Sequence, residues 1–259
     1  MTYGEFADVY DQLMDDYDYD AWAKHYLELI GSDGKLPSTY RLTECACGTG
    51  NLTIRFAAAG GRVTGIDLSP AMLRCAEKKA RSSGVAVSFV QQDMRKLKLG
   101  HRTDALLCTC DGLNYLLTRE DVTAFFKAAL EALKPGGIFC FDISSQYKLE
   151  QILGNSFQGE ERDGLALLWQ NRFDEKNRIV TMDVTFFVRE EDGKYRRFRE
   201  EHRQRAHSRD ELFAWLQQAG FEDIRVYGEY TMDSPREKDT RLHFRAVKPE
   251  QTEVDSDED

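Results

Sequence analysis

Apolar residues recur along this chain in two spacings, one typical of helices and one typical of short buried strands. Between residues 20 and 30 the apolar side chains fall at helical spacing, and Gly31 ends the pattern. From Tyr40 onward, short apolar runs alternate with longer amphipathic stretches. This alternation predicts a parallel sheet covered by crossover helices.

Turn and capping residues divide this region into elements. Ser69 and Pro70 supply an N-cap and a proline at the first position of a helix. The segment Lys134–Gly137 should break the helix that follows Thr118. The predicted strands cover residues 40–46, 62–66, 85–90, 105–110 and 138–143, and the predicted helices cover 51–59, 70–80 and 119–133.

An additional segment, residues 145–206, separates this region from the C-terminal elements. It holds strand-like runs at 166–173, 178–190 and 194–205, with Asp192 and Gly193 as a hairpin turn between the last two. We therefore expect an antiparallel sheet inserted on one edge. Ser208 and Glu211 then open a helix that ends at Gly220, and strands at 221–230 and 241–247 follow.

Composition and charge narrow the function classes. The chain has 259 residues, 41% of them hydrophobic, which is enough for a large core. Its net charge of -10 argues against a general affinity for nucleic-acid phosphates. With no signal-like start and no apolar stretch of about 18 residues, we expect no membrane span and a cytoplasmic location. The six cysteines lie in apolar segments, which predicts reduced thiols.

The loop after the first strand carries the first chemical signal. It reads Glu44-Cys-Ala-Cys-Gly-Thr-Gly50, and the small residues Ala46, Gly48 and Gly50 would let backbone N–H groups approach a ligand at a helix N-terminus. On this loop alone, a tight turn without a ligand is the alternative.

Two further acids end the next two strands. Asp67, 17 residues after Gly50, could accept both hydroxyls of a ribose, or it could merely cap the helix that follows. Asp93 and Met94 could meet the amino group and a ring nitrogen of adenine, whereas a lone acid there would be a solvated loop residue. Acids at the carboxyl ends of consecutive parallel strands converge on one crevice, so these residues predict a nucleoside ligand, a nicotinamide nucleotide or S-adenosylmethionine.

With these residues, the chain from about 3 to 247 resembles the class I S-adenosylmethionine-dependent methyltransferases. In that family the acidic glycine loop cradles the methionine part, the second acid holds the ribose and the third holds the adenine. Ala46 stands here where the family has its first glycine. Residues 211–230 and 241–248 resemble the family's closing antiparallel strand pair, which nicotinamide-binding domains lack. The resemblance therefore implies S-adenosylmethionine as cofactor and S-adenosylhomocysteine as product.

The resemblance also implies an architecture. The fold is expected to be α/β, a Rossmann-like, seven-stranded, mostly parallel sheet with helices on both faces and an inserted antiparallel β-sheet. We expect an N-terminal helical lid at 1–39 and a cofactor-binding domain at 40–144 and 207–248. The insertion at 145–206 would form the acceptor site or a dimer contact, and the acidic tail at 249–259 should be disordered.

Carried over by position, Leu68 and Met72 should flank the adenine, although both could instead be core residues of a helix. Cys110 and Asp111 should border the methyl and acceptor site. The N-terminal run YGEFADVYDQLM and the insertion resemble the subgroup of glycine N-methyltransferase and the nucleotide-linked aminosugar N,N-dimethyltransferases. In those enzymes an N-terminal tyrosine lies over the sulfonium, which implies this role for Tyr10.

Tyr19 and Trp22 are further candidates for the same role, although all of these aromatics could simply pack the N-terminal helices. Tyr10 and Asp111 are the predicted catalytic residues. A small-molecule amine is the favoured acceptor. The alternatives are a tRNA base or another macromolecule, or a cofactor-binding protein without transfer activity.

Three other patterns carry weaker expectations. A hydroxyl acceptor would need a base such as His202 or His207, but each is expected to be a surface residue. The pairs Cys45/Cys47 and Cys108/Cys110 could in principle form a four-thiolate site, yet we expect no metal. The stripe from Arg196 to Arg205 could hold a substrate anion, but the interleaved Glu200 and Glu201 favour an internally paired strand. We expect a monomer or homodimer.

Overall fold

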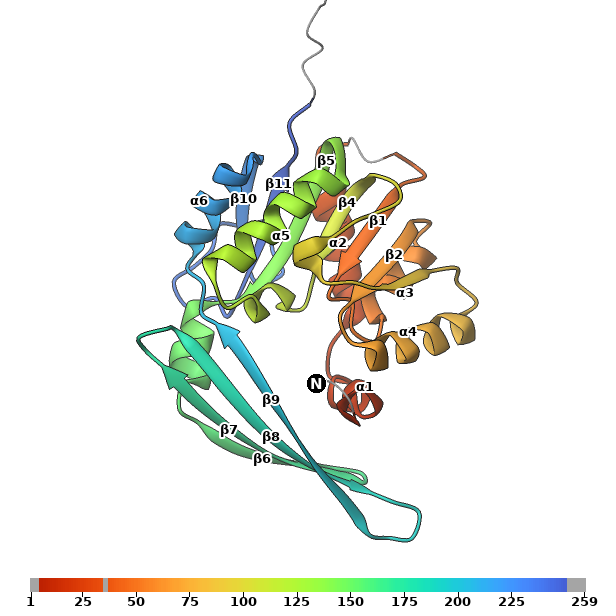
Figure 1. Cartoon of the computed structure of the whole chain (residues 1–259), viewed down its shortest axis with the longest axis vertical. Helices are drawn as coiled ribbons and strands as arrows, with labels where there is room; N and C mark the ends of the chain where they lie inside the picture. The colour runs from red at the N-terminus through yellow and green to blue at the C-terminus, as the bar shows by residue number, and fades with distance from the viewer. Residues whose placement is uncertain (1–4, 35–36, 251–259) are drawn as a thin grey trace, which may run out of the picture.

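Two β-sheets form the body of the molecule, as the computed structural model shows for residues 5–34 and 37–250 (Figure 1). In the larger sheet, β11 runs antiparallel to both of its neighbours and the pairs among β1 to β5 are parallel. This confirms the predicted seven-stranded, mostly parallel sheet with its closing antiparallel pair. The strand order is β10 (Glu222–Gly228), β11 (Arg241–Val247), β5 (Leu133–Ser144), β4 (Thr103–Cys108), β1 (Arg41–Cys45), β2 (Arg62–Asp67) and β3 (Ser88–Gln91).

Helices cover both faces of this sheet. On one face, α5 (Arg119–Ala132) and α6 (Arg209–Ala219) bury an apolar cluster that includes Phe125 and Phe139. On the other, α2 (Tyr19–Gly31) and α3 (Asn51–Ala58) pack Tyr26 and Phe56 against the strands. The helix α4 (Pro70–Ser83) lies along β2 and β3. The central strands are buried on both faces, which explains their nearly continuous apolar sequences.

The helix ends confirm several predicted caps. Ser69 Oγ accepts a hydrogen bond from the backbone N–H of Met72 at 3.3 Å. At the start of α6, Ser208 Oγ accepts from the N–H of Glu211 at 3.2 Å, and the Glu211 carboxylate accepts from the N–H of Ser208 at 3.0 Å. Gly220 ends α6 with φ at 100°, a left-handed conformation that glycine adopts without a steric penalty.

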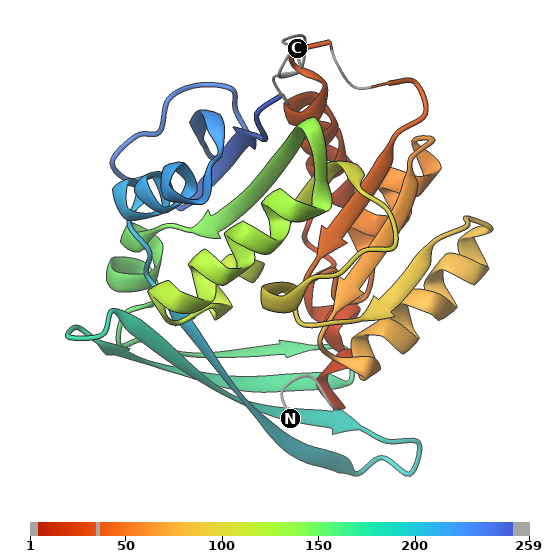
Figure 2. The ribbon, with the colours of Figure 1, turned by 45° about the horizontal axis from the view of Figure 1, so that its top comes forward.

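The insertion forms a separate antiparallel sheet of four strands, which confirms the predicted inserted antiparallel β-sheet. Figures 1 and 2 show it below the main sheet. Its strands are β6 (Phe157–Arg162), β7 (Leu165–Asp174), β8 (Ile179–Arg189) and β9 (Tyr195–Arg205). The pattern missed β6 because almost all of its side chains are exposed, so they show no alternation of apolar and polar residues. The predicted turn between β8 and β9 is confirmed, with Gly193 at φ 81°.

Helix α5 ends at Ala132, which agrees with the predicted break at Lys134–Gly137, but β5 begins at Leu133, before the predicted strand start at residue 138. The register between β4 and β5 shifts between Thr103 and Ala105, so the strand tolerates this irregular stretch. Backbone bonds to the chain beyond β11 also support it: the N–H of Gly136 donates to the Lys248 carbonyl at 3.0 Å, and the N–H of Lys248 donates to the Gly137 carbonyl at 2.9 Å.

The short N-terminal helices η1 (Glu5–Asp8) and α1 (Tyr10–Leu13) bridge the two sheets (Figure 1). The ring of Phe6 lies 5.0 Å from that of Phe186 on β8, while Ala7 packs against Met72 on α4. Among the described residues, no helix has the length and apolar character needed to cross a membrane. The part of the predicted tail from residue 251 on lies outside the described residues.

Candidate functional site

A cavity of about 640 Å³ lies at the carboxyl ends of β1, β2 and β4. The N-terminal helices and β9 close its other side. The predicted site residues that line it are Tyr10, Tyr19, Glu44, Ala46, Gly48, Asp67, Leu68, Met72, Asp93, Met94 and Cys110. Trp22, Gly50 and Asp111 are not part of the lining. The strand ends thus bring together the three acids and most of the predicted loop.

The loop after β1 turns sharply beside the cavity. Ala46, Gly48 and Gly50 all have positive φ angles, of 54°, 55° and 75°. This conformation suits the two glycines but costs a residue with a Cβ about 1–2 kcal/mol. The loop also packs closely, because a Cβ on Gly112 would lie 2.8 Å from the Cβ of Ala46. Strain of this kind accumulates at functional sites, where the surrounding structure holds it in place.

Glu44 is a buried acid at the end of β1, with 1% of its surface exposed. Its carboxylate accepts hydrogen bonds from the hydroxyls of Thr53 and Thr109, the latter at 2.7 Å. Burial raises the pKa of Glu44 to about 7, although these hydrogen bonds oppose the shift. A cation placed in the cavity near this carboxylate would therefore favour its charged form.

Asp67 joins two loops at the cavity floor. One carboxylate oxygen accepts from the backbone N–H of Gly48 and the other from that of Ser69, both at 2.8 Å. Burial raises the pKa of Asp67, while these backbone hydrogen bonds lower it. The contact with Ser69 is the capping role considered above. The carboxylate also lines the cavity, so the capping contact does not keep it from a ligand.

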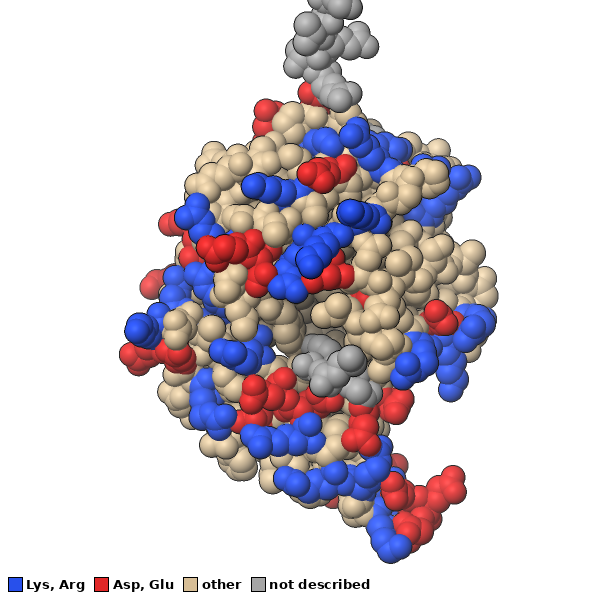
Figure 3. Space-filling view, viewed as in Figure 1, with Lys and Arg blue, Asp and Glu red and all other residues tan. Residues whose placement is uncertain are grey.

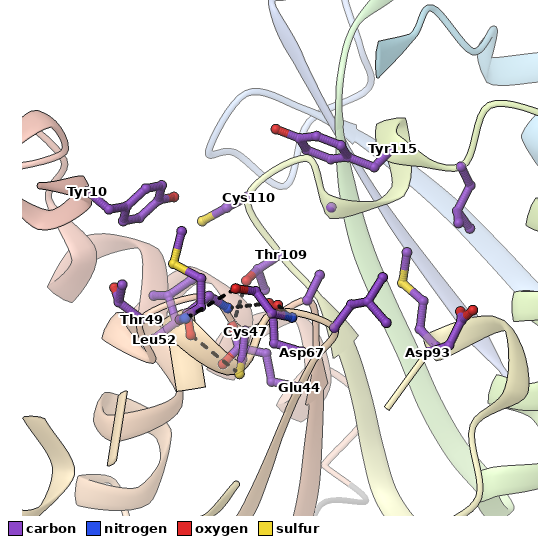
Figure 4. Close-up of a pocket in the computed structure, with 18 of the residues that line it drawn as sticks. Tyr10, Glu44, Cys47, Thr49, Leu52, Asp67, Asp93, Thr109, Cys110 and Tyr115 are labelled. Atoms are coloured by element: carbon purple, nitrogen blue, oxygen red, sulfur yellow. Dashed lines mark hydrogen bonds between the residues drawn. The ribbon is translucent and has the colours of Figure 1, made fainter. Parts of the chain in front are cut away.

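Asp93 lies at the end of the cavity away from Tyr10 (Figure 4). It accepts a hydrogen bond from the backbone N–H of Arg95 at 2.9 Å and further bonds from the Arg95 guanidinium. The Arg95 side chain thereby lowers the pKa of Asp93. Arg95 lines the cavity too, and nothing in the sequence pattern had singled it out.

Aromatic side chains form the opposite wall. Figure 4 shows Tyr10, Cys110 and Tyr115 facing the strand ends that carry Glu44 and Asp67. Burial raises the pKa of Tyr10 well above its usual value, so its hydroxyl stays protonated. Tyr10, Tyr19, Cys110 and Tyr115 belong to three separate segments of the chain, which the fold brings together.

His202 on β9 completes this wall, with its Nδ1 3.3 Å from the hydroxyl of Tyr115. Burial lowers the pKa of His202 to about 4, so the ring is neutral at pH 7. The expectation that His202 and His207 lie on the surface was wrong. His202 faces inward on the alternating strand β9, and the Nε2 of His207 is buried 3.0 Å from the carbonyl of Leu116.

Asp111 and Trp22 lie behind the cavity lining, around a buried arginine. Arg241 Nη2 donates to the Asp111 carboxylate at 2.9 Å, and Gln204 Nε2 donates to its other oxygen at 2.6 Å. Arg241 also pairs with the buried Asp142, and its guanidinium lies 4.8 Å from the ring centroid of Trp22. Both residues therefore support the wall that Cys110 forms.

Arginines of the β9 stripe form ion pairs with acids outside the strand. Arg199 pairs with Asp183 at 2.5 Å and Arg205 with Glu211 at 3.2 Å. Arg203 lines the cavity instead.

The cysteines do not gather into a cluster. Cys45 and Cys108 are register partners on β1 and β4, and all six cysteines are free thiols. Within residues 5–34 and 37–250, no group of three or more His, Cys, Asp or Glu side chains is placed to hold a metal ion.

Several lining residues escaped the sequence pattern. Thr109 directly follows β4, so the strand-end argument that selected Glu44 and Asp67 could have found it. Tyr115 lies six residues further on, in η3 (Gly112–Tyr115). Glu201 and Arg203 come from the insertion: Arg203 belongs to the arginine stripe considered above as a substrate-anion site, whereas no pattern marked Glu201 as a cavity residue.

Comparisons with known proteins agree with this geometry. Residues 43–137 match a family model described as a methyltransferase domain. A Bacillus subtilis (strain 168) protein named as a methyltransferase, YqeM, is 38% identical over 96% of this chain and 98% of its own length. A crystal structure of an S-adenosylmethionine-dependent methyltransferase from Clostridium acetobutylicum ATCC 824 is 33% identical, with a TM-score of 0.86 over 96% of this chain and 99% of that one.

A third relative matches only part of the chain. The Streptomyces venezuelae dTDP-3-amino-3,4,6-trideoxy-alpha-D-glucopyranose N,N-dimethyltransferase is 33% identical over 52% of this chain and 55% of its own length.

Proposed function

This chain belongs to the S-adenosylmethionine-dependent methyltransferases, and from that premise we propose that it methylates a small-molecule amine. The membership confirms the predicted enzyme class, cofactor and Rossmann-like fold. The predicted resemblance to aminosugar N,N-dimethyltransferases is confirmed as well. The acceptor and the roles of single residues are the subject of the proposal.

The proposed cofactor position follows the three acids. The ribose hydroxyls would bind Asp67, and the adenine amino group would bind Asp93, with the N–H of Met94 at a ring nitrogen. Leu68 and Met72 would flank the adenine. The amino group of the methionine part would lie near Glu44, whose raised pKa of about 7 marks it as a carboxyl that gains by meeting a cation. The residues present therefore fit this cofactor.

When bound, S-adenosylmethionine supplies a methyl group on a positively charged sulfur, which is already an excellent leaving group. The chain has to align the acceptor and exclude water. Tyr10, Tyr19 and Cys110 would form the wall next to the methyl group, where tyrosine rings favour a cation. Trp22 and Asp111 would act from behind by holding Arg241.

One observation supports an amine acceptor above others: His202, the histidine of the acceptor wall, is a weak base. Its pKa of about 4 leaves little capacity to take a proton from a hydroxyl group at pH 7. The Asp111 carboxylate is occupied by Arg241 and Gln204. An amine that arrives deprotonated needs no base, so it suits this wall.

Size and charge support a small acceptor. The cavity of about 640 Å³ must hold the cofactor and the reacting group, and pockets of about 300–1,000 Å³ normally take one drug-sized molecule. Figure 3 shows Lys and Arg side chains interspersed with Asp and Glu on the face it displays, and the net charge is -10. A tRNA base or another macromolecular acceptor is the second candidate, and the charge disfavours it.

The proposal includes the domain roles and the setting. Residues 1–39 would act as a lid, and the insertion at 145–206 would shape the acceptor pocket through His202 and Arg203. Six free thiols are typical of a protein in the reducing cytoplasm. A monomer or homodimer would suffice, because one chain supplies both walls of the cavity.

A methyl-transfer screen tests the proposal. S-adenosylmethionine is offered with glycine, sarcosine, a dTDP-linked aminosugar, a sugar alcohol and bulk tRNA, and release of S-adenosylhomocysteine is measured. We expect turnover on an amine and none on the sugar alcohol. The Asp67→Ala variant serves as the background control. Turnover on tRNA alone would overturn the small-molecule proposal. Cofactor binding without turnover on any acceptor would favour a cofactor-binding protein without transfer activity.

A further inference from the structure

Arg95 lies between two carboxylates at the end of the cavity where Asp93 lies. Its Nε is 2.9 Å and 3.0 Å from the two Asp93 oxygens, and its Nη2 is 2.6 Å from Oδ2. Its Nη1 donates to Asp121 Oδ1 at 2.7 Å. All three side chains line the cavity. The planar guanidinium therefore fixes the plane of the Asp93 carboxylate and is itself held in place by Asp121.

The second carboxylate belongs to a rigid element. Asp121 lies in the first turn of α5, where its backbone N–H donates to the N-cap hydroxyl of Thr118 at 3.1 Å. The same helix buries Phe125 and Phe126 completely in the main core. Arg95 thus links the short η2 helix (Met94–Lys96) to a helix that the core holds in place.

The contacts at Asp93 leave room for one more donor. A carboxylate offers about four acceptor positions on its two oxygens. Arg95 meets them with three hydrogens, those of its backbone N–H, its Nη2 and its Nε, the last shared between Oδ1 at 2.9 Å and Oδ2 at 3.0 Å. The remaining position suits a single N–H group from the cavity. Because the carboxylate is already charged and aimed, a ligand that donates this bond loses little free energy in ordering it.

We propose that Arg95 is a positioning residue that makes the cavity select the 6-amino group of adenine, by holding Asp93 ionised and turned toward it. The inference rests on the placement of adenine at Asp93 in the proposed function. A base that carries a 6-oxo group offers this carboxylate an oxygen in place of the N–H donor. The held carboxylate therefore repels it, whereas a mobile carboxylate could turn away.

The test compares S-adenosylhomocysteine with its 6-deamino analogue, in which hydrogen replaces the 6-amino group and N1 stays an acceptor, by titration calorimetry. We expect the unmodified protein to prefer the adenosyl ligand by about tenfold or more, the effect of losing one hydrogen bond to a charged group. In Arg95→Leu this preference should fall to about threefold or less, mainly through weaker binding of the adenosyl ligand. Arg95→Lys, which keeps a charge but not the fork, should lie between the two.

Two variants make the result decisive. Asp93→Asn tests the placement of adenine itself, so an unchanged preference there would overturn the proposed cofactor position. If Asp93→Asn loses the preference and Arg95→Leu keeps it, the positioning role of Arg95 is overturned alone. Arg225→Leu is the matched control, because Arg225 pairs with Asp223 at the same spacing of two residues, at 2.9 Å, outside the cavity lining. It should leave both affinities unchanged.

Two further outcomes would contradict the inference. Equal weakening of both ligands in Arg95→Leu would mean a general structural role. Tighter binding of the adenosyl ligand would mean that Arg95 obstructs the site.

Discussion

Binding of S-adenosylhomocysteine should strengthen about tenfold between pH 6 and pH 8 because of one buried carboxyl group, Glu44. In the structure, burial raises the pKa of Glu44 to about 7, so the group is largely protonated at pH 6. The ligand keeps the amino group of the methionine part, which carries a positive charge at both pH values. Binding should therefore require Glu44 to be ionised, and a proton should be released at low pH.

The size of the effect follows from the ionised fraction. With a pKa of about 7, about one tenth of the Glu44 carboxyls are charged at pH 6 and about nine tenths at pH 8. The ratio corresponds to about 1.4 kcal/mol of binding free energy. His202 does not contribute in this window, since its pKa of about 4 keeps it neutral throughout. Affinity should rise with pH because the ligand-free protein binds the proton more tightly than the complex does.

Titration calorimetry across this pH range, in two buffers with different ionisation enthalpies, measures both the affinity and the protons released. Glu44→Gln is the control, because the amide keeps the shape, can accept from one of the Thr53 and Thr109 hydroxyls with its oxygen and donate to the other with its NH2, but cannot ionise. Its affinity should be low and nearly independent of pH. A pH-independent affinity in the unmodified protein, or a pH dependence that survives in Glu44→Gln, would refute the assignment of Glu44 to the cofactor's amino group.

Three other perturbations have defined outcomes. Asp67→Ala should weaken S-adenosylhomocysteine binding at least tenfold, about 1.4 kcal/mol, measured by calorimetry on a variant that keeps its circular dichroism spectrum. Arg241→Met should lower the free energy of unfolding in urea by about 3–5 kcal/mol, because it leaves Asp142 buried without its ion pair. The double variant Arg241→Met with Asp142→Asn should lose less of this free energy, because no unpaired charge stays buried. Burial lowers the pKa of His243 in the folded protein. The folded state therefore has its full stability above about pH 6.5, where the histidine of the unfolded chain is neutral as well. This stability is lost as the pH falls, because the unfolded chain takes up the proton first. Urea unfolding at pH 7.5 and pH 5.5 should show a smaller loss in His243→Gln than in the unmodified protein.

Local signals were sufficient for the parts of the fold that depend on neighbouring residues. Ser69 and the pair of Ser208 with Glu211 start helices where the capping pattern placed them. Gly220 ends α6 because a left-handed residue was needed there. The central strands of the main sheet were found because their apolar runs are buried on both faces, as β4 illustrates.

The misses occur where tertiary contacts decide the structure. Lys134–Gly137 forms the first part of β5 because backbone hydrogen bonds with Lys248 and a register shift support it. Neither feature is visible in a local sequence pattern. Polar, exposed side chains concealed β6, which forms because β7 offers it a complete hydrogen-bonded partner.

The same division holds for the cavity. Glu44, Asp67 and Asp93 could be predicted because the ends of consecutive parallel strands always meet at one edge of the sheet. His202 could not, because it reaches the cavity only through the position of the second sheet. Burial also lowers the pKa of His202 to about 4 and keeps its ring neutral, whereas the sequence predicted a surface residue.

The strained backbone beside the cavity explains why a buried arginine lies so close to it. Cys110 and Asp111 both have positive φ angles, 54° and 53°, which cost about 1–2 kcal/mol each for residues with a Cβ. Asp142 accepts the N–H of Asp111 at 2.9 Å, and Arg241 holds the carboxylates of both acids. Without Arg241 these two carboxylates would repel each other, and the turn would relax to a more favourable φ. The side chain of Cys110 would then move from the cavity wall, so Arg241 supports the shape of the cavity as well as the stability of the fold.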